Sequence, residues 1–320
     1  MPTIRIALVL CLLATPMGAP AQSYPTKPIR MIAPFAVGGA TDLLARALCE
    51  ALTRSLGKPC VVENRVGGGG IIGFEAVANA EPDGHTLLMA PNTINVLPHL
   101  HAKLPYDTER DFVAVARVAS TPSMLGGHPS VPAASIAELL PYLKANSGKL
   151  TFGSCAPTSV QHLGGELLAQ AQGFRWTHVP YKGCGQALTD TISGQVPIII
   201  STVAHLMPQI KAGKLRGYAV MARDRSPFAP DIPSIAEAGV PGFDVDAWFG
   251  VVAPAKIPGP VLERLNSEIN RWLSDPTVRE RLLAQSYKPL GGTPQEMLAV
   301  FQRESQLFGK VIREAGIKIE

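Results

Sequence analysis

The sequence predicts an α/β fold of two lobes, built from mainly parallel sheets flanked by helices. Short apolar segments rich in Val, Ile and Leu alternate along the chain with longer segments of helical periodicity. This alternation is typical of parallel strands covered by helices. The chain has 320 residues, with 30 glycines and 29 prolines. This length allows two domains, and the glycines and prolines fit many short loops.

The predicted elements follow in chain order. We predict strands at residues 29–34, 60–64, 86–90, 150–154, 176–180, 196–202 and 215–221. Helices are predicted after the first of these strands and at residues 71–80, 136–145, 160–171, 261–273 and 295–314. In the first helix Leu44, Leu48, Leu52 and Leu56 recur every four residues, and Gly57 favours a left-handed end.

No linker divides the chain into two halves in series, so we predict that one lobe is inserted into the other. The crossings are placed near residues 117–124 and 243–248. Lobe 1 would contain residues 22–120 and 247–320, and lobe 2 residues 121–246. A ligand cleft is expected between the lobes, because open α/β sheets bind ligands at the carboxyl ends of their strands.

The N-terminus has the pattern of an export signal. Arg5 precedes an apolar run, and small residues, Ala19 and Ala21, occupy the positions before a cleavage site. The run is shorter than a membrane span requires. We therefore predict that residues 1–21 are a signal peptide and that the protein is periplasmic.

Composition excludes some classes of protein. The formal net charge is +4, and the cations are scattered and form no basic stripe with aromatic neighbours, so nucleic acid binding is not expected. No Cys-x-x-Cys pair indicates a zinc or redox site, and no phosphate-binding lysine motif follows the glycines. We expect no metal and no cofactor.

The loop at residues 35–42 is the most informative segment. Its candidate ligand contacts are Phe35, Val37, Gly38, Gly39, Ala40, Thr41 and Asp42. We expect the two glycines to turn the chain with positive φ, and the free N–H groups of the following helix to bind a carboxylate. Asp42 has two interpretations, a ligand contact or an acid favoured by the first turn of a helix.

Ordered motifs extend over nearly the whole chain. They include Pro34-Phe35, Gly38-Gly39, Glu63-Asn64-Arg65, residues 67–70, Pro82-Asp83-Gly84-His85, Leu104-Pro105-Tyr106-Asp107, Gly165-Glu166-Leu167, Val179-Pro180-Tyr181-Lys182-Gly183 and Glu237-Ala238-Gly239. With these motifs the chain resembles the Bug family of periplasmic solute-binding proteins, the receptors related to tripartite tricarboxylate transporters. The resemblance implies a type II Venus-flytrap fold whose closed cleft holds a ligand carboxylate through loop amides and ordered water.

Further candidate contacts lie in later loops. They are Gly69, Asn92, Thr93, Ser154, Ala156, Thr158, Ser159, His162, Lys182 and Trp248. Six of them have a structural alternative: a tight turn for Gly69, a turn cap for Asn92 and Thr93, a packed ring for His162, a solvated cation for Lys182 and a hinge plug for Trp248.

The chain departs from this family at three positions. Ala156 and Thr158 stand where relatives have glycine, and Pro197 stands where relatives usually have aspartate. A side chain at Thr158 resists a left-handed conformation, so the loop of lobe 2 is expected to differ in shape. Loss of the aspartate disfavours an acidic amino acid as ligand.

Four cysteines follow the predicted signal peptide, an even number that permits two disulfides in an oxidising compartment. Cys155 and Cys184 each follow a strand of lobe 2 and form the best pair. Cys49 and Cys60 lie on neighbouring elements of lobe 1 and form a second pair, unless Cys49 belongs to the buried helix face.

The sequence favours a monomeric receptor that closes around a small carboxylated solute. Its partners would be the subunits of a membrane transporter or, alternatively, a membrane sensor to which the loaded protein is a messenger. A third hypothesis is a secreted hydrolase that uses Ser159 and His162, but no third orienting group is evident.

Overall fold

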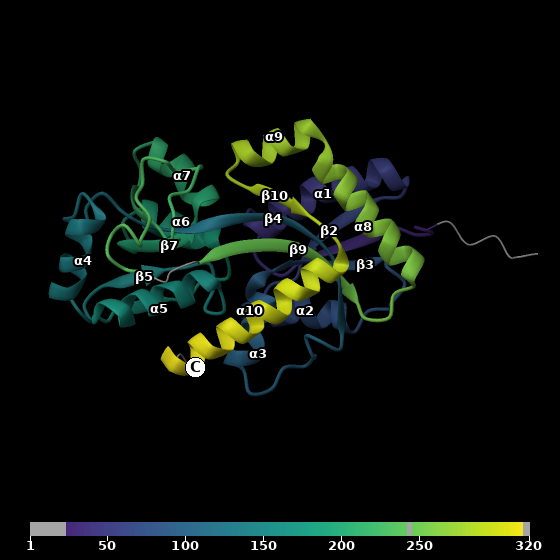
Figure 1. Cartoon of the computed structure of the whole chain (residues 1–320), viewed down its shortest axis with the longest axis horizontal. Coiled ribbons are helices and arrows are strands. Elements are labelled where there is room, and N and C mark those ends of the chain that lie inside the picture. The colour runs from purple at the N-terminus through teal and green to yellow at the C-terminus, as the bar shows by residue number, and fades with distance from the viewer. Residues whose placement is uncertain (1–23, 242–244, 316–320) are drawn as a thin grey trace, which may run out of the picture.

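The computed structural model describes residues 24–241 and 245–315 (Figure 1). The predicted signal peptide, residues 1–21, and the start of the predicted second crossing, Phe243, lie outside the described residues. Within the described ranges, no helix has both the length and the apolar character needed to cross a bilayer.

The strands are β1 (Ile29–Ala33), β2 (Cys60–Asn64), β3 (Thr86–Pro91), β4 (Phe112–Gly127), β5 (Thr151–Gly153), β6 (Thr177–Val179), β7 (Ile198–Thr202), β8 (Arg216–Val220), β9 (Asp246–Pro254) and β10 (Lys288–Gly291). The α-helices are α1 (Ala40–Leu56), α2 (Ile71–Ala78), α3 (Leu97–Leu100), α4 (Ile136–Ala145), α5 (Val160–Gln172), α6 (Cys184–Ile192), α7 (Val203–Lys211), α8 (Gly259–Ser274), α9 (Pro276–Ala284) and α10 (Pro294–Ala315). Two short 3-10 helices are η1 (Gly68–Gly70) and η2 (Asn92–Asn95).

The strands form a mixed sheet in the order β2-β1-β3-β9-β4-β7-β5-β6, and β8 and β10 also pair with β4. Pairing is parallel at both ends, where β1 lies between β2 and β3 and β5 lies between β6 and β7. The middle is antiparallel, because β9 runs against β3 and β4, and β4 runs against β7. The alternation of strands and helices indicated only the parallel ends.

β4 connects the two ends of the sheet. Residues 112–122 of this 16-residue strand pair with β9, while residues 123–127 pair with β7. Figure 1 shows β4 and β9 running side by side between a group of elements that includes α4 to α7 and a second group that includes α1, α2 and α8. The strands that join these groups thus determine where loops from both meet.

The first helix forms as its leucine repeat predicts. Leu44, Leu48 and Leu52 are buried in a core cluster with β1 and α8, and Gly57 ends α1 with φ of 71°. A separate cluster lies around β7, where Phe152 and Ile198 pack with α4 and α5. Two apolar cores therefore support the two groups of elements.

The sequence did not indicate α6, α7, α9 or β10. Pro208 lies inside α7, and α6 contains one glycine and two threonines, which are poor helix formers. These short helices depend on packing against the sheet more than on local propensity. Two of them, α6 and α7, turn out to contribute to the candidate site.

Candidate functional site

A small inner cavity of about 40 Å³ lies where loops from both groups of elements meet. Its lining residues are Phe35, Gly39, Ala40, Thr41, Pro91, Asn92, Thr93, Cys155, Ser159, Gln161, Gly183, Cys184, Thr202, Ala247 and Phe249. A site for one water needs at least about 10–15 Å³, so this volume suits a few water molecules or one carboxylate group.

Four helices begin at the inner cavity. Their N-cap residues, Gly39 of α1, Ser159 of α5, Gly183 of α6 and Thr202 of α7, all line it. The first N–H groups of a helix lack intrahelical partners, and the helix dipole adds partial positive charge at that end. Among the described residues that line the cavity, none is an Asp, Glu, Lys or Arg. The arrangement therefore favours a small anion over a cation.

The first loop turns at a single glycine. Gly38 has φ of 83°, whereas Gly39 is an extended N-cap with φ of −77°. The expectation that both glycines have positive φ is thus wrong for Gly39, because the N-cap position itself requires an extended backbone. Phe35, Gly39, Ala40 and Thr41 reach the cavity, while Val37 is 68% exposed.

Asp42 lies in the first turn of α1 and does not line the cavity. Its carboxylate accepts a hydrogen bond of 3.0 Å from the backbone N–H of Gly38 and forms an ion pair of 2.8 Å with Arg46. Burial raises the pKa of Asp42, but the hydrogen bonds from Arg46 and Gly38 outweigh it and hold the pKa below its ordinary value. The acid therefore fixes the shape of the loop.

Asn92 and Thr93 line the cavity from the start of η2. The Asn92 amide donates a hydrogen bond of 2.9 Å to the backbone oxygen of Asp246, the first residue of β9. This bond uses one of the two N–H groups of the amide, which leaves the second N–H and the amide oxygen of Asn92. Thr93 is buried and lines the same cavity.

The loop before α5 contributes fewer contacts than its sequence suggested. Ser159 lines the cavity, and its hydroxyl donates to the backbone oxygen of Ala156 at 2.7 Å. Thr158 instead donates to the backbone oxygen of Gly69 at 2.7 Å. Neither Thr158 nor Gly69 lines the cavity. Ser154 is buried behind the loop, 2.8 Å from the ring of His178.

His162 is packed away from the hydroxyl of Ser159. Its ring stacks on His178 with centroids 4.0 Å apart, and its Nδ1 lies 2.5 Å from the backbone oxygen of Pro157. The other ring nitrogen lies 3.5 Å from Glu166. Burial, and then the charge of His162, lower the pKa of His178 to about 3. The described contact between Ser159 and His162 is a hydrogen bond of 3.2 Å from the His162 backbone N–H to Ser159 Oγ, whereas a hydrolase would need the His162 ring at that hydroxyl.

Lys182 and Trp248 also lie outside the inner cavity. Lys182 is exposed, and its backbone oxygen accepts a hydrogen bond of 3.4 Å from the N–H of Ala36. The Trp248 indole points to the opposite face of β9, where it donates to Glu304 at 2.7 Å and stacks on Phe301. Successive strand residues face opposite sides, so Ala247 and Phe249 line the cavity instead.

Sequence reasoning did not include several lining residues. They are Pro91, Gln161, Gly183, Thr202, Ala247 and Phe249. Thr202 had a usable signal, because a threonine at the end of a strand is a good N-cap for a following helix. Phe249 also had a usable signal, because residues two apart in a strand, such as Ala247 and Phe249, lie on the same face of the sheet. Gln161 had no local signal.

Both predicted disulfides are present. Cys49 joins α1 to β2 through Cys60, and Cys155 joins the loop before α5 to the first residue of α6 through Cys184. The second bridge lines the inner cavity. Within the described part of the chain, no three or more His, Cys, Asp or Glu side chains are grouped to hold a metal ion.

The chain matches known proteins over most of its length. Residues 44–317 match the model of the tripartite tricarboxylate transporter family receptor. Protein BugT of Bordetella pertussis is 36% identical over 319 residues, which cover 99% of this chain and 97% of BugT.

Solved structures show the same fold. R. palustris Rpa4515 with adipate has a TM-score of 0.89 at 33% identity, covering 92% of this chain and 99% of that chain. MatC from Rhodopseudomonas palustris with bound malate has a TM-score of 0.86 at 31% identity, covering 90% of this chain and 100% of that chain. The protein therefore belongs to the tripartite tricarboxylate transporter receptor family, a family of periplasmic solute-binding proteins that includes the Bug proteins.

Proposed function

We propose that the protein binds the carboxylate group of a small solute in the inner cavity. The observation that carries this proposal is the meeting of four helix N-termini, those of α1, α5, α6 and α7, around one cavity without a charged lining residue among those described. Such N-termini bind anions through free N–H groups and the helix dipole. The hydroxyls of Thr41, Thr93 and Ser159 would add neutral contacts.

Two related structures support a carboxylate as the ligand. One was solved with adipate and the other with malate, both dicarboxylates. The present cavity of about 40 Å³ suits a carboxylate better than a whole dicarboxylate. A longer ligand would therefore bind with the surrounding loops further apart.

The lobes proposed from the sequence, residues 22–120 with 247–320 and residues 121–246, would open and close around this ligand. Two contacts would join them in the closed form. Thr158 donates to the backbone oxygen of Gly69, and the N–H of Ala36 donates to the backbone oxygen of Lys182. Ligand binding that favours the closed form would shift the equilibrium toward these contacts.

In the cell this binding would deliver the solute to the subunits of a membrane transporter. The family description supports this role. A ligand-loaded messenger for a membrane sensor would use the same closed form, so the two roles share the binding step. Hydrolysis is disfavoured, because the Ser159 hydroxyl donates to a backbone oxygen and His162 stacks on His178.

The test compares acids with their uncharged analogues. Malate and adipate, with malamide and adipamide as matched controls, are titrated into the protein while its unfolding temperature is followed. A bound acid stabilises the protein by about 2.7 kcal/mol at 100 times its Kd, and the amides are expected to give no shift. Equal shifts with acid and amide would contradict an anion site.

A pair of variants locates the site. Thr93→Asp places a carboxylate in the inner cavity, and Thr93→Asn places an uncharged group of the same size there. We expect the Asp variant to lose binding of the acid, because like charges repel, while the Asn variant retains most of it. Thermal unfolding without ligand checks that both variants fold. Full binding by a folded Asp variant would place the ligand elsewhere.

A further inference from the structure

The bridge between Cys155 and Cys184 is part of the wall of the inner cavity. Both cysteines line this cavity of about 40 Å³, and they are 9% and 8% exposed. Cys155 lies in the loop before α5, and Cys184 is the first residue of α6. The other bridge joins Cys49, inside α1, to Cys60 of β2 and does not line the cavity. A change in the redox state of the first bridge would therefore alter the cavity itself.

Cys184 lies where a helix stabilises negative charge. It follows Gly183, the N-cap residue of α6, and among the described contacts no side chain caps this helix. The α5 helix differs, because the Ser159 hydroxyl accepts a hydrogen bond from the N–H of His162. Thiols at helix N-termini have pKa values of about 3.5–7.5, against about 8.5 for a free cysteine, because the first N–H groups and the dipole favour the thiolate. Reduced Cys184 is therefore expected to be ionised near neutral pH.

Cys155 has no comparable helix position. It lies in the loop before the N-cap residue Ser159, and its Sγ lies 3.8 Å from the hydroxyl of Ser201. In thiol–disulfide exchange the thiol of lower pKa is the better leaving group. An attacking thiolate is therefore expected to bond to Sγ of Cys155 and to displace Cys184.

The elements packed against the start of α6 hold few ionisable groups. β5 and β7 contain none, and none of the described residues that line the cavity is an Asp, Glu, Lys or Arg. Asp190 of α6 accepts a hydrogen bond of 2.7 Å from Tyr181, and Lys182 is exposed. In the facing loop of lobe 1, Asp42 pairs with an arginine of α1 at 2.8 Å. Burial lowers the pKa of His205 on α7 to about 4, so its ring is neutral at pH 7. The helix N-termini therefore dominate the electrostatics at this position.

We propose that the bridge between Cys155 and Cys184 is a thiol-exchange site, whose reduction releases a Cys184 thiolate into the anion position of the inner cavity and so expels the carboxylate ligand. The reaction partner is a dithiol, as a small molecule or in a thiol–disulfide oxidoreductase. This inference rests on the carboxylate-binding function proposed above.

The exchange is balanced in atoms and electrons. One sulfur of the dithiol bonds to Sγ of Cys155, and the bond between the two cysteines breaks with its electron pair on Cys184. The second sulfur of the dithiol then displaces Cys155, so the dithiol is oxidised to a disulfide and the two cysteines are reduced. Of the two protons of the dithiol, one goes to Cys155 and the other to water.

Ligand binding and reduction of the bridge are expected to oppose each other. A carboxylate at the helix N-termini disfavours a thiolate at the same place, because like charges repel. Linkage requires that reduction weakens ligand binding by the same factor by which the ligand disfavours reduction. We expect this factor to be at least about tenfold, since the two charges would lie close together in a small cavity.

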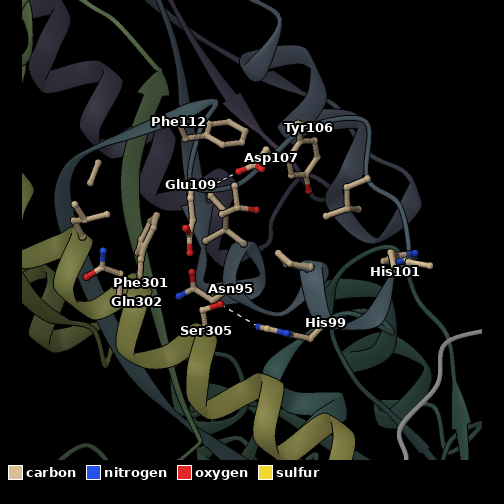
Figure 2. Close-up of a pocket in the computed structure, with 17 residues that line it drawn as sticks. Asn95, His99, His101, Tyr106, Asp107, Glu109, Phe112, Phe301, Gln302 and Ser305 are labelled. Carbon is tan, nitrogen blue, oxygen red and sulfur yellow. Dashed lines mark hydrogen bonds between the residues drawn. The ribbon is translucent and has the colours of Figure 1, made fainter.

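A larger outer cavity does not confuse the measurement of carboxylate binding. It measures about 410 Å³ and is separated from the inner cavity by η2, since Asn92 lines the inner one and Asn95 the outer one. Figure 2 shows Asp107 and Glu109 among the side chains that surround it. None of its described lining residues is a Lys, Arg or Cys. A loss of malate binding on reduction would therefore report on the inner cavity.

Two single variants with the same broken bridge separate the charge from the constraint. Cys155→Ser leaves a free Cys184 at the start of α6, and Cys184→Ser leaves a free Cys155 in the loop. At about pH 8 we expect Cys155→Ser to bind malate at least about tenfold more weakly, and the gap to narrow as the pH falls, because the thiolate is protonated. The double variant Cys155→Ser/Cys184→Ser should bind as Cys184→Ser does. Calorimetry measures the affinities, and equal affinities of the two single variants at about pH 8 would overturn the proposal.

The second test follows reduction of the bridge itself. The protein is equilibrated with mixtures of reduced and oxidised dithiothreitol, with and without saturating malate, and alkylated thiols are counted by mass spectrometry. The variant Cys49→Ser/Cys60→Ser keeps only the cavity bridge, and malate should raise the dithiothreitol ratio at half reduction at least about tenfold. The double variant Cys155→Ser/Cys184→Ser keeps only the other bridge and is the matched control, for which malate should leave the ratio unchanged.

Three results of this test would overturn the inference. They are an unchanged ratio for the cavity bridge, equal shifts for both bridges, and a cavity bridge that excess dithiothreitol does not open in the ligand-free protein. If the oxidised protein binds neither malate nor adipate, the carboxylate function itself fails, and this inference fails with it. If malate binds equally well with the bridge open and closed, only this inference fails.

Discussion

The Thr158 hydroxyl donates a 2.7 Å hydrogen bond to the backbone oxygen of Gly69, a residue 89 positions earlier in the chain. Gly69 has φ of 64°, and a Cβ atom placed there would lie 2.5 Å from Cγ2 of Thr158. The glycine thus allows both the backbone shape and the close approach. Thr158 makes this contact beside the inner cavity and does not itself line the cavity.

Gly69→Ala is expected to weaken both folding and carboxylate binding. The positive φ alone costs about 1–3 kcal/mol for a residue other than glycine, and the clash with Thr158 adds to it. Gly148→Ala is the matched control, because Gly148 also has positive φ, 78°, with nothing within 4 Å of its Cβ position. Chemical unfolding and malate titration should show a stability loss in both variants and an affinity loss only for Gly69→Ala. Equal affinities would show that this contact has no part in closure.

Thr158→Val removes the hydrogen bond to Gly69 while keeping the shape of the side chain. We expect a stability loss of about 1 kcal/mol, typical of one buried hydrogen bond. Thr158→Ser retains the hydroxyl and should retain ligand affinity. Ligand titration of both variants checks this. If the Thr158→Val and Thr158→Ser variants bind the ligand equally well, the Thr158 hydroxyl does not contribute to closure of the proposed lobes.

The bridge between Cys155 and Cys184 is expected to stabilise the fold and shape the inner cavity. In the chain-entropy model a loop of 29 residues gives about 3.5 kcal/mol, and the 11-residue loop of Cys49 and Cys60 about 3 kcal/mol. Replacing either pair by serine should therefore lower stability. Only the pair at Cys155 and Cys184 should also weaken carboxylate binding, because only that pair lines the cavity. Equal binding losses from both pairs would contradict this assignment.

Glu304 is expected to make stability fall as the pH rises. Burial raises the pKa of Glu304 above its ordinary value of 4.5, against the hydrogen bonds from Trp248 and Asn95. The folded carboxyl then holds its proton more tightly than the unfolded one, so stability decreases from about pH 4.5 up through the raised pKa.

Glu304→Gln tests this sign. The amide oxygen can still accept from Trp248 and Asn95, which both bind Oε2 of Glu304. The variant should gain stability relative to the parent as the pH rises above about 4.5, measured by chemical unfolding. The exposed Glu280→Gln variant is the control for a surface charge. If the stability difference between Glu304→Gln and the parent does not change with pH, burial does not raise the pKa of Glu304.

Part of the lining of the inner cavity was predictable because it comes from one continuous segment of the chain. The strand β1, the loop of Phe35 to Thr41 and the helix α1 follow one another in the chain, and their glycine and leucine patterns record that order. The bridge between Cys155 and Cys184 was also predictable, since these cysteines follow β5 and β6, two short strands of the same sheet. Asp42 stayed ambiguous, because a first-turn acid has the same sequence pattern whether it binds a ligand or the loop.

The sequence by itself determined the family, the first helix with the loop before it, and the favoured cysteine pair, Cys155 with Cys184. Only the tertiary structure decided that α6 and α7 also begin at the inner cavity, that Trp248 faces α10 while Phe249 faces the cavity, and that Thr158 reaches Gly69. Local sequence patterns determine which helices, strands and turns are formed by residues that are close together in the chain. The pairing of β4 with both β9 and β7 brings loops from distant parts of the chain together, and no single segment contains that information.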